Sequence, residues 1–226
     1  MKILILFFCA ISATFAFVPN LRAKNLCPPN AKAIKIDKTL QALILEKHNT
    51  LRNEIAGGKI RGYKSAAAMA EMTWDKDLAK LAAKNAMTCD YNHDDYHETA
   101  KYPDAGQNLG LEQMKGKDTT DKAFIEGTID NWWSEHKDAN QGVIDSYHES
   151  DEEVDIGHFT VMANERSYKI GCAAVFYVKD KWNTRYLVCN YAMTNLDGSP
   201  VYKTGKPQSA CKEGKSKKYK NLCSSA

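Results

Sequence analysis

The sequence predicts a single α+β domain with a short disulfide-stapled C-terminal tail. Three observations predict it. Apolar residues recur at helical spacing in three separate segments, and two strand-like segments each carry one cysteine. The chain of 226 residues is long enough to bury one sizeable core, and it contains no internal repeat.

Each of the three predicted helices begins at a capping residue. Asp37 can cap a helix that runs to about Ala56, where two glycines end it. Asp75 opens a second helix, and Asp118 caps a third. Their apolar faces are formed by Leu40, Leu43, Ile44, Leu51 and Ile55 in the first, Leu78, Leu81, Ala82 and Ala86 in the second, and Phe124, Ile125, Ile129, Trp132 and Trp133 in the third. The two tryptophans are therefore interpreted as core residues.

The segments 169–179 and 184–193 are rich in Val, Phe and Tyr and are predicted to form a hairpin joined by residues 180–183. Opposed residues of an antiparallel hairpin have a constant sum of residue numbers. Cys172 and Cys189 therefore fall opposite or nearly opposite each other, and a cross-strand disulfide is geometrically reasonable.

The first residues predict export. A basic start at Lys2, an apolar run over 3–10 and a small-x-small site ending at Ala16 are typical of a signal peptide over 1–16. We therefore expect a secreted, extracellular protein. A lead segment (17–36), a main domain (37–197) and a Lys-rich tail (198–226) are predicted to follow.

Removal of the signal peptide leaves six cysteines, an even number that predicts three disulfides in an exported chain. Cys211 and Cys223 flank the Lys-rich tail and most simply pair with each other, which leaves Cys27 with Cys89. The cysteines lack C-x-x-C spacing, which disfavours a structural zinc site.

The net charge of +3 is small and argues against nucleic acid as a partner. The sequence has no segment typical of a transmembrane helix, so no integral membrane contact is expected. The stretch 203–220 contains seven lysines and one acid, Glu213. A solvated surface is the simplest interpretation of this run, and contact with a protein target, an anionic membrane or a polysaccharide is the alternative.

Several segments between about Leu40 and Asn195 carry a family resemblance. Apart from the cysteine hairpin they are Ile44-Leu45-Glu46-Lys47-His48-Asn49, Met72-Thr73-Trp74-Asp75, Cys89-Asp90-Tyr91-Asn92-His93, Gly106-Gln107-Asn108, Trp132-Trp133-Ser134-Glu135 and Gly157-His158-Phe159-Thr160. In order and spacing the chain resembles the CAP superfamily (cysteine-rich secretory, antigen 5 and pathogenesis-related proteins), and within it the insect antigen 5 proteins. The resemblance implies an α-β-α sandwich and supports the pairs Cys27–Cys89 and Cys172–Cys189. The chain departs from the family pattern at Val161 and Asn164, where a Gln and a Trp are usual.

By position the resemblance implies a cleft tetrad of His93, Gln107, Glu135 and His158. Two neutral imidazoles can bind Zn²⁺ or a similar ion, so His93 and His158 are the candidate ligands of a weak, exchangeable metal site. Gln107 offers only a neutral amide oxygen where many relatives have Glu, and it cannot act as a base. The tetrad is therefore interpreted as a hydrogen-bonded polar cluster rather than a permanent cofactor site. A second metal motif, His93 with His97, would need a helix that the surrounding acids disfavour.

The sequence offers no convincing catalytic set. It has neither a Gly-x-Ser-x-Gly nor a His-Glu-x-x-His motif, and Ser134 and Glu135 are helix neighbours that point in different directions. We therefore expect a secreted, non-enzymatic and monomeric antigen 5-like protein that binds a small hydrophobic ligand such as a sterol or fatty acid, or a protein target through its tail. The alternative is a metal-dependent enzyme at the His93/His158 cleft.

Overall fold

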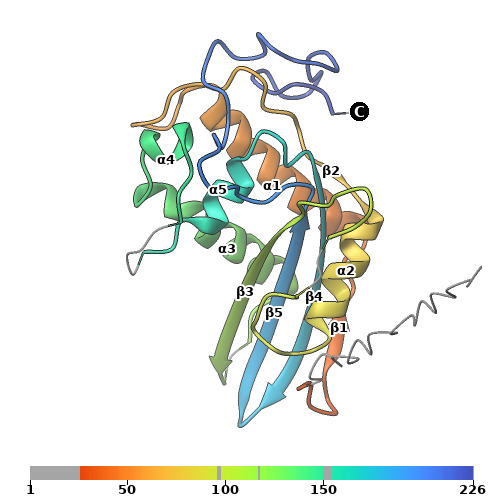
Figure 1. Ribbon diagram of the computed structural model, residues 1–226. Coiled ribbons are helices and arrows are strands. Elements are labelled where there is room, and N and C mark those ends of the chain that lie inside the picture. Colours follow the sequence, from red (N-terminus) through yellow and green to blue (C-terminus); the bar gives the residue numbers. More distant parts are fainter. Residues whose placement is uncertain (1–25, 96–97, 117, 150–153, 226) are drawn as a thin grey trace, which may run out of the picture.

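The computed structural model describes residues 26–95, 98–116, 118–149 and 154–225, so the predicted signal peptide lies outside the described residues. Figure 1 shows the helices gathered around one sheet. The helices are α1 (Lys38–Ala56), α2 (Lys76–Ala86), α3 (Asp121–Ser134), α4 (Gln141–Asp145) and α5 (Gly157–Ala163), with a 3₁₀ turn at Glu135–Lys137. The strands are β1 (Lys32–Ile34), β2 (Thr73–Trp74), β3 (Gly106–Lys115), β4 (Lys169–Lys179) and β5 (Trp182–Tyr191).

The sheet has the strand order β1-β4-β5-β3, and the short β2 pairs in parallel with β4. The β4–β5 hairpin is predicted correctly, and Cys172 lies directly opposite Cys189 and is bonded to it. The turn is tighter than the predicted four-residue loop, because Lys179 pairs with Trp182. Asp180 and Lys181 alone make the turn, both with positive φ (51° and 67°), as a type I′ turn requires.

Helices cover both faces of the sheet, which confirms the predicted α-β-α sandwich. The main core lies between α1, α3, α5 and one sheet face, where Leu187, Cys189 and Tyr191 point. On the other face α2 packs over a smaller core that includes Val188. The approach of α2 is so close that a Cβ on Gly171 would lie 2.1 Å from the backbone nitrogen of Ala79.

Two of the three helices begin where the sequence predicts. The side chains of Asp37 and Asp75 accept hydrogen bonds from backbone amides in the first turns of α1 and α2. The cap predicted for the third helix is wrong: Thr120, not Asp118, caps α3. The carboxylate of Asp118 is instead ion-paired with Arg185 of β5, a long-range partner that local sequence does not reveal.

A buried arginine joins α1 to two later parts of the chain. Arg52 is fully buried, and its guanidinium donates to the carbonyls of Ala70, Met162 and Asn164 at 2.7–3.2 Å. Burial lowers the pKa of Arg52 to about 9, so it stays charged at neutral pH. One side chain thus fixes the segment before β2 and the end of α5 to α1.

The C-terminal tail is packed into the main core. Tyr202 and Leu222 are buried there, and the predicted Cys211–Cys223 disulfide is present. The Cys27–Cys89 disulfide joins the lead segment to the chain after α2. The lysines of the tail are therefore exposed on a segment whose apolar side chains are anchored in the core.

Candidate functional site

An open cleft of about 780 Å³ lies where the start of β3 meets α5. Its walls come from four parts of the chain that are distant in sequence. The lining residues are His93, Gln107, Asn108, Tyr147, Glu149, Val154, Asp155, Ile156, Gly157, His158, Val161, Thr194, Asn195 and Asp197. Apart from the two histidines, its ionisable lining side chains are acidic or phenolic, so the described lining contains no lysine or arginine.

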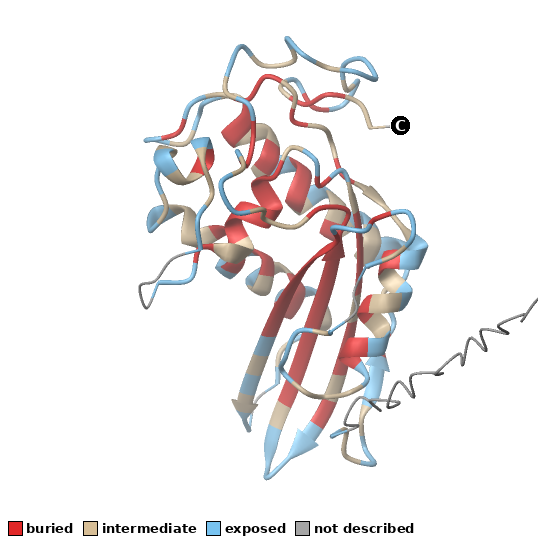
Figure 2. Cartoon of the chain, viewed as in Figure 1, coloured by how far each residue is buried: buried red, intermediate tan, exposed pale blue. Residues whose placement is uncertain are grey.

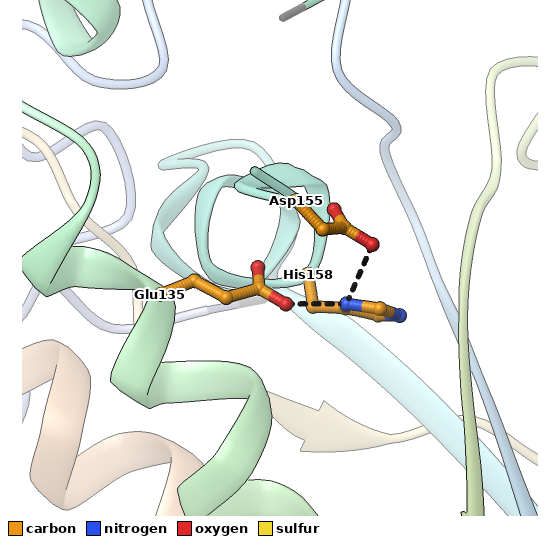
Figure 3. A group of neighbouring side chains, drawn as sticks. All are labelled: Glu135, Asp155 and His158. Carbon is orange, nitrogen blue, oxygen red and sulfur yellow. Dashed lines mark hydrogen bonds and ion pairs between the residues drawn. The ribbon is translucent and has the colours of Figure 1, made fainter. Parts of the chain in front are cut away.

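His158 is held by two carboxylates. Its Nδ1 lies 2.6 Å from Oε1 of Glu135 and 3.5 Å from Oδ2 of Asp155 (Figure 3). The second oxygen of Glu135 accepts the backbone N–H of Phe159, and the imidazole stacks on Trp132 at 5.9 Å between centroids. Glu135 therefore fixes both the ring of His158 and the start of α5.

The surroundings of His158 favour its charged form. Burial lowers the pKa of the imidazole, but the hydrogen bond and charge of Glu135, with the charge of Asp155, outweigh burial and raise the pKa above its ordinary value. A protonated Nδ1 donates to Glu135, which is the arrangement the short distance favours.

His93 belongs to a second polar group. Its Nδ1 lies 3.0 Å from Oε1 of Gln107. The amide nitrogen of Gln107 donates to Asp94 at 2.9 Å and to Asn190 at 3.0 Å. A glutamate at position 107 would bring two carboxylates together at Asp94, which gives a physical reason for the amide in this chain.

The predicted tetrad thus divides into two pairs, Glu135 with His158 and His93 with Gln107, although both histidines line the same cleft. Among the described residues, the one set of three potential metal ligands within 4.8 Å of one another is Glu135, Asp155 and His158. The sequence interpretation did not include Asp155. Its place three residues before His158, next to the start of α5, was the available signal.

A buried chain of hydrogen bonds connects α1 with the cleft. His48 Nδ1 lies 2.8 Å from the Ile44 carbonyl, so this nitrogen carries the proton, and Nε2 accepts from the hydroxyl of Tyr191. Burial lowers the pKa of His48 to about 4, which keeps it neutral. The Asn108 amide donates to the Tyr191 hydroxyl and to the His158 carbonyl. His48 therefore acts as a buried structural link between α1 and β5.

Other candidates from the sequence are not assembled into a site. His97 lies outside the described residues, and residues 90–95, which precede it, are not helical. Ser134 Oγ donates to the carbonyl of Asn131 at 2.8 Å and not to Glu135 or His158. No serine or cysteine is found among the described residues that line the cleft.

Comparison with known proteins agrees with this architecture. The model of the cysteine-rich secretory protein family (CAP) matches residues 45–191, so the chain belongs to that family. It is 40% identical to Venom allergen-1 of Aedes aegypti over 88% of this chain and 78% of that protein. It is 37% identical to the antigen 5 like allergen Cul n 1 of Culicoides nubeculosus, over 70% of this chain and 71% of the other.

The fold is likewise similar to solved structures. A structure of NaASP2 with Zn²⁺ superposes with a TM-score of 0.69 and 27% identity, covering 87% of this chain and 99% of that one. Within the described residues, no helix combines the length and apolar character needed to cross a bilayer.

The Glu135–His158 pair predicts a measurable change in titration. In Glu135→Gln the pKa of His158 should fall from above to below its ordinary value of about 6.5, since burial then dominates. Asp155→Asn should lower it by less, because Asp155 is more distant and more exposed. NMR titration of the imidazole measures both shifts, and an unchanged pKa in Glu135→Gln contradicts the assignment.

The same shift has a defined effect on stability. Because the folded pKa is raised, the pair stabilises the wild type fully below the unfolded pKa and loses this contribution as pH rises through the folded pKa. The difference in unfolding free energy between wild type and Glu135→Gln should therefore shrink as the pH rises from the unfolded pKa of His158 through its folded pKa.

Proposed function

We propose that this chain is a secreted, non-enzymatic CAP protein that binds a small hydrophobic ligand. The observation that carries the proposal is an apolar groove of about 680 Å³ that runs along α1 and opens to solvent. This volume and lining are typical of sites for small organic ligands.

Aliphatic side chains dominate the groove. Leu40, Leu43 and Leu45 of α1 and Met72 before β2 form much of the wall. Lys122 of α3 and Lys218 of the tail stand among the lining residues. Lys218 is already ion-paired with Glu46, whereas Lys122 is exposed and forms no ion pair within the described part of the chain. A fatty acid fits this arrangement, with its chain on the leucines and its carboxylate near Lys122.

Two further observations support the other parts of the proposal. Three disulfides in one domain are typical of an oxidising, extracellular compartment. The cleft joins His158 to carboxylates rather than to a hydroxyl or thiol, so its described residues do not form the nucleophile–base pair that covalent hydrolysis needs.

The groove can be blocked from the surface of α1. Ala42 is an exposed lining residue of the groove, and Ala42→Arg places a bulky charged side chain there. Binding of a fluorescent fatty acid should weaken by at least about tenfold, because the alkyl chain of the ligand would have to displace the arginine or strip water from its charge. Thr50→Arg adds the same charge on an exposed position of the same helix outside the groove and serves as the matched control.

Lipid extraction and mass spectrometry of protein from its native secretion complete the test. If no lipid co-purifies and the wild type has no affinity for a fatty acid, the lipid proposal is overturned. A protein target would then be favoured if the wild type binds an extracellular protein and neutralisation of Lys215, Lys217 and Lys220 in the tail abolishes that binding.

A second candidate function is weak divalent-metal binding in the cleft. The ligand atoms of Glu135, Asp155 and His158 already lie within 4.8 Å of one another, and carboxylate and imidazole donors suit Zn²⁺. A similar fold is that of NaASP2, whose structure was solved with Zn²⁺. The ion would have to displace the proton from His158 Nδ1, so protons compete for the site. Bound there, the ion would supply Lewis acidity, while the three side chains would hold and orient it.

Calorimetric titration with Zn²⁺ separates this triad from the two-histidine site. His158→Ala and Asp155→Asn should weaken binding by about tenfold or more, whereas His93→Ala should leave it unchanged. Equal Zn²⁺ affinity in the wild type and His158→Ala would contradict metal binding at His158. A large loss in His93→Ala would favour the pair His93 and His158.

A further inference from the structure

Lysines surround an exposed tryptophan at the free end of the sheet. We define the hairpin end as Lys115, Lys179, Lys181 and Trp182, all of which are exposed. Figure 1 shows it at the opposite end of the molecule from the C-terminal tail. The strands extend beyond the helices there, and Figure 2 shows them changing from buried to exposed along their length.

The hairpin end has a fixed geometry. Trp182 pairs in register with Lys115 of β3 and with Lys179 of β4. Residues paired across neighbouring strands point to the same face, so the side chains of Lys115, Trp182 and Lys179 share one face of the sheet. Lys115 Nζ lies 5.1 Å from the centre of the indole ring. Trp182 is 39% exposed, whereas Trp132 and Trp133, the core residues of α3, are 3% and 5% exposed.

The turn presents the third lysine at a conformational cost. Lys181 has φ 67°, in the left-handed region where type I′ turns strongly favour glycine or asparagine. A long side chain is held at the tip of the hairpin although glycine would suit the backbone better. An outlier of this kind is a reason to look for function at that position.

Exposed apolar side chains continue from the hairpin end along the same face of the sheet. Leu111 lies four residues before Lys115 on β3 and is 38% exposed. It pairs with Tyr186, against which the ring of Tyr91, 49% exposed, packs edge-on. The tail at the other end has more lysines, but its large apolar side chains Val201, Tyr202, Tyr219 and Leu222 are buried.

We propose that the hairpin end docks onto an anionic lipid surface. Three lysines against the single carboxylate of Asp180 complement a negatively charged bilayer, and Trp182 suits the interface, where indole rings are enriched. The exposed leucine and tyrosine add apolar contact, so a membrane accounts for both features of the surface. This docking surface is separate from the groove on α1 and does not depend on the proposed function.

The experiment measures binding of the full mature chain to vesicles of phosphatidylcholine with and without 30 mol% phosphatidylserine, a composition chosen at roughly the anionic level of a charged leaflet. Sedimentation should show binding that requires phosphatidylserine and weakens with salt. Quenching of tryptophan fluorescence by brominated lipid should report insertion of Trp182, and Trp182→Phe should abolish it.

Three single variants and one triple variant test the surface, and a triple variant of the tail is the control. Lys181→Gly relieves the backbone conformation, so it keeps the fold, and it should weaken binding about fivefold. Trp182→Ala should weaken binding by about tenfold. Asp180→Asn removes the opposing charge in a turn that tolerates asparagine, and it should strengthen binding. Neutralisation of Lys115, Lys179 and Lys181 together should reduce vesicle binding far more than neutralisation of Lys215, Lys217 and Lys220 in the tail does.

The alternatives give different outcomes. Absence of phosphatidylserine-dependent binding, or an equal loss in the two triple-lysine variants, overturns the proposal. Binding to heparin but not to vesicles assigns the lysines to a polysaccharide, and self-association that Trp182→Ala abolishes assigns the surface to a second copy of the chain; both overturn it. Ala42→Arg should bind vesicles as the wild type does, so failure of the groove and failure of the docking surface are distinguishable.

Discussion

The cleft depends on one buried charge. Arg52 is fully buried, and among the described residues no carboxylate is hydrogen-bonded to it. Three backbone carbonyls accept hydrogen bonds from its guanidinium instead. Loss of the guanidinium would leave these buried carbonyls without their partner, which is more costly than the net gain from forming the bonds. Because two of the carbonyls belong to Met162 and Asn164, the end of α5 is fixed by a residue of α1. Short helices such as α5 have little stability of their own.

The hydrogen bonds around the cleft extend this constraint to the functional groups. The hydrogen-bonded pair His48–Tyr191 fixes the side chain of Asn108, whose amide donates to the carbonyl of His158. Glu135 fixes the imidazole ring of His158. The polar cleft, the apolar groove on α1 and the hairpin end are therefore formed by different residues. The three surfaces have different chemistry: acidic and polar, apolar, and basic with an exposed indole. Such a division suits a binding protein that displays several sites on one disulfide-linked scaffold.

Local signals in the sequence predicted α1, α2 and the cysteine hairpin, because capping aspartates and strict periodicity determine such elements locally. They failed for β3, whose Gly-Gln-Asn start lacks β-branched residues and whose pairing depends on β5. They also failed for α5, which begins with glycine and has tertiary support. The family resemblance implied a tetrad of His93, Gln107, Glu135 and His158. Only the fold shows that the Gln107 amide donates to Asp94 and that Asp155 lies beside His158. Spacing along the chain does not determine such contacts.

Native-state hydrogen exchange of the Phe159 amide in Arg52→Lys tests the central constraint most directly. Lysine keeps the charge but lacks the planar fork that reaches several carbonyls at once. If Arg52 holds α5, protection of this amide should fall by at least about tenfold more than protection of the Val188 amide in the sheet, which reports global stability. Equal loss at both amides, or no loss at Phe159, would contradict the account.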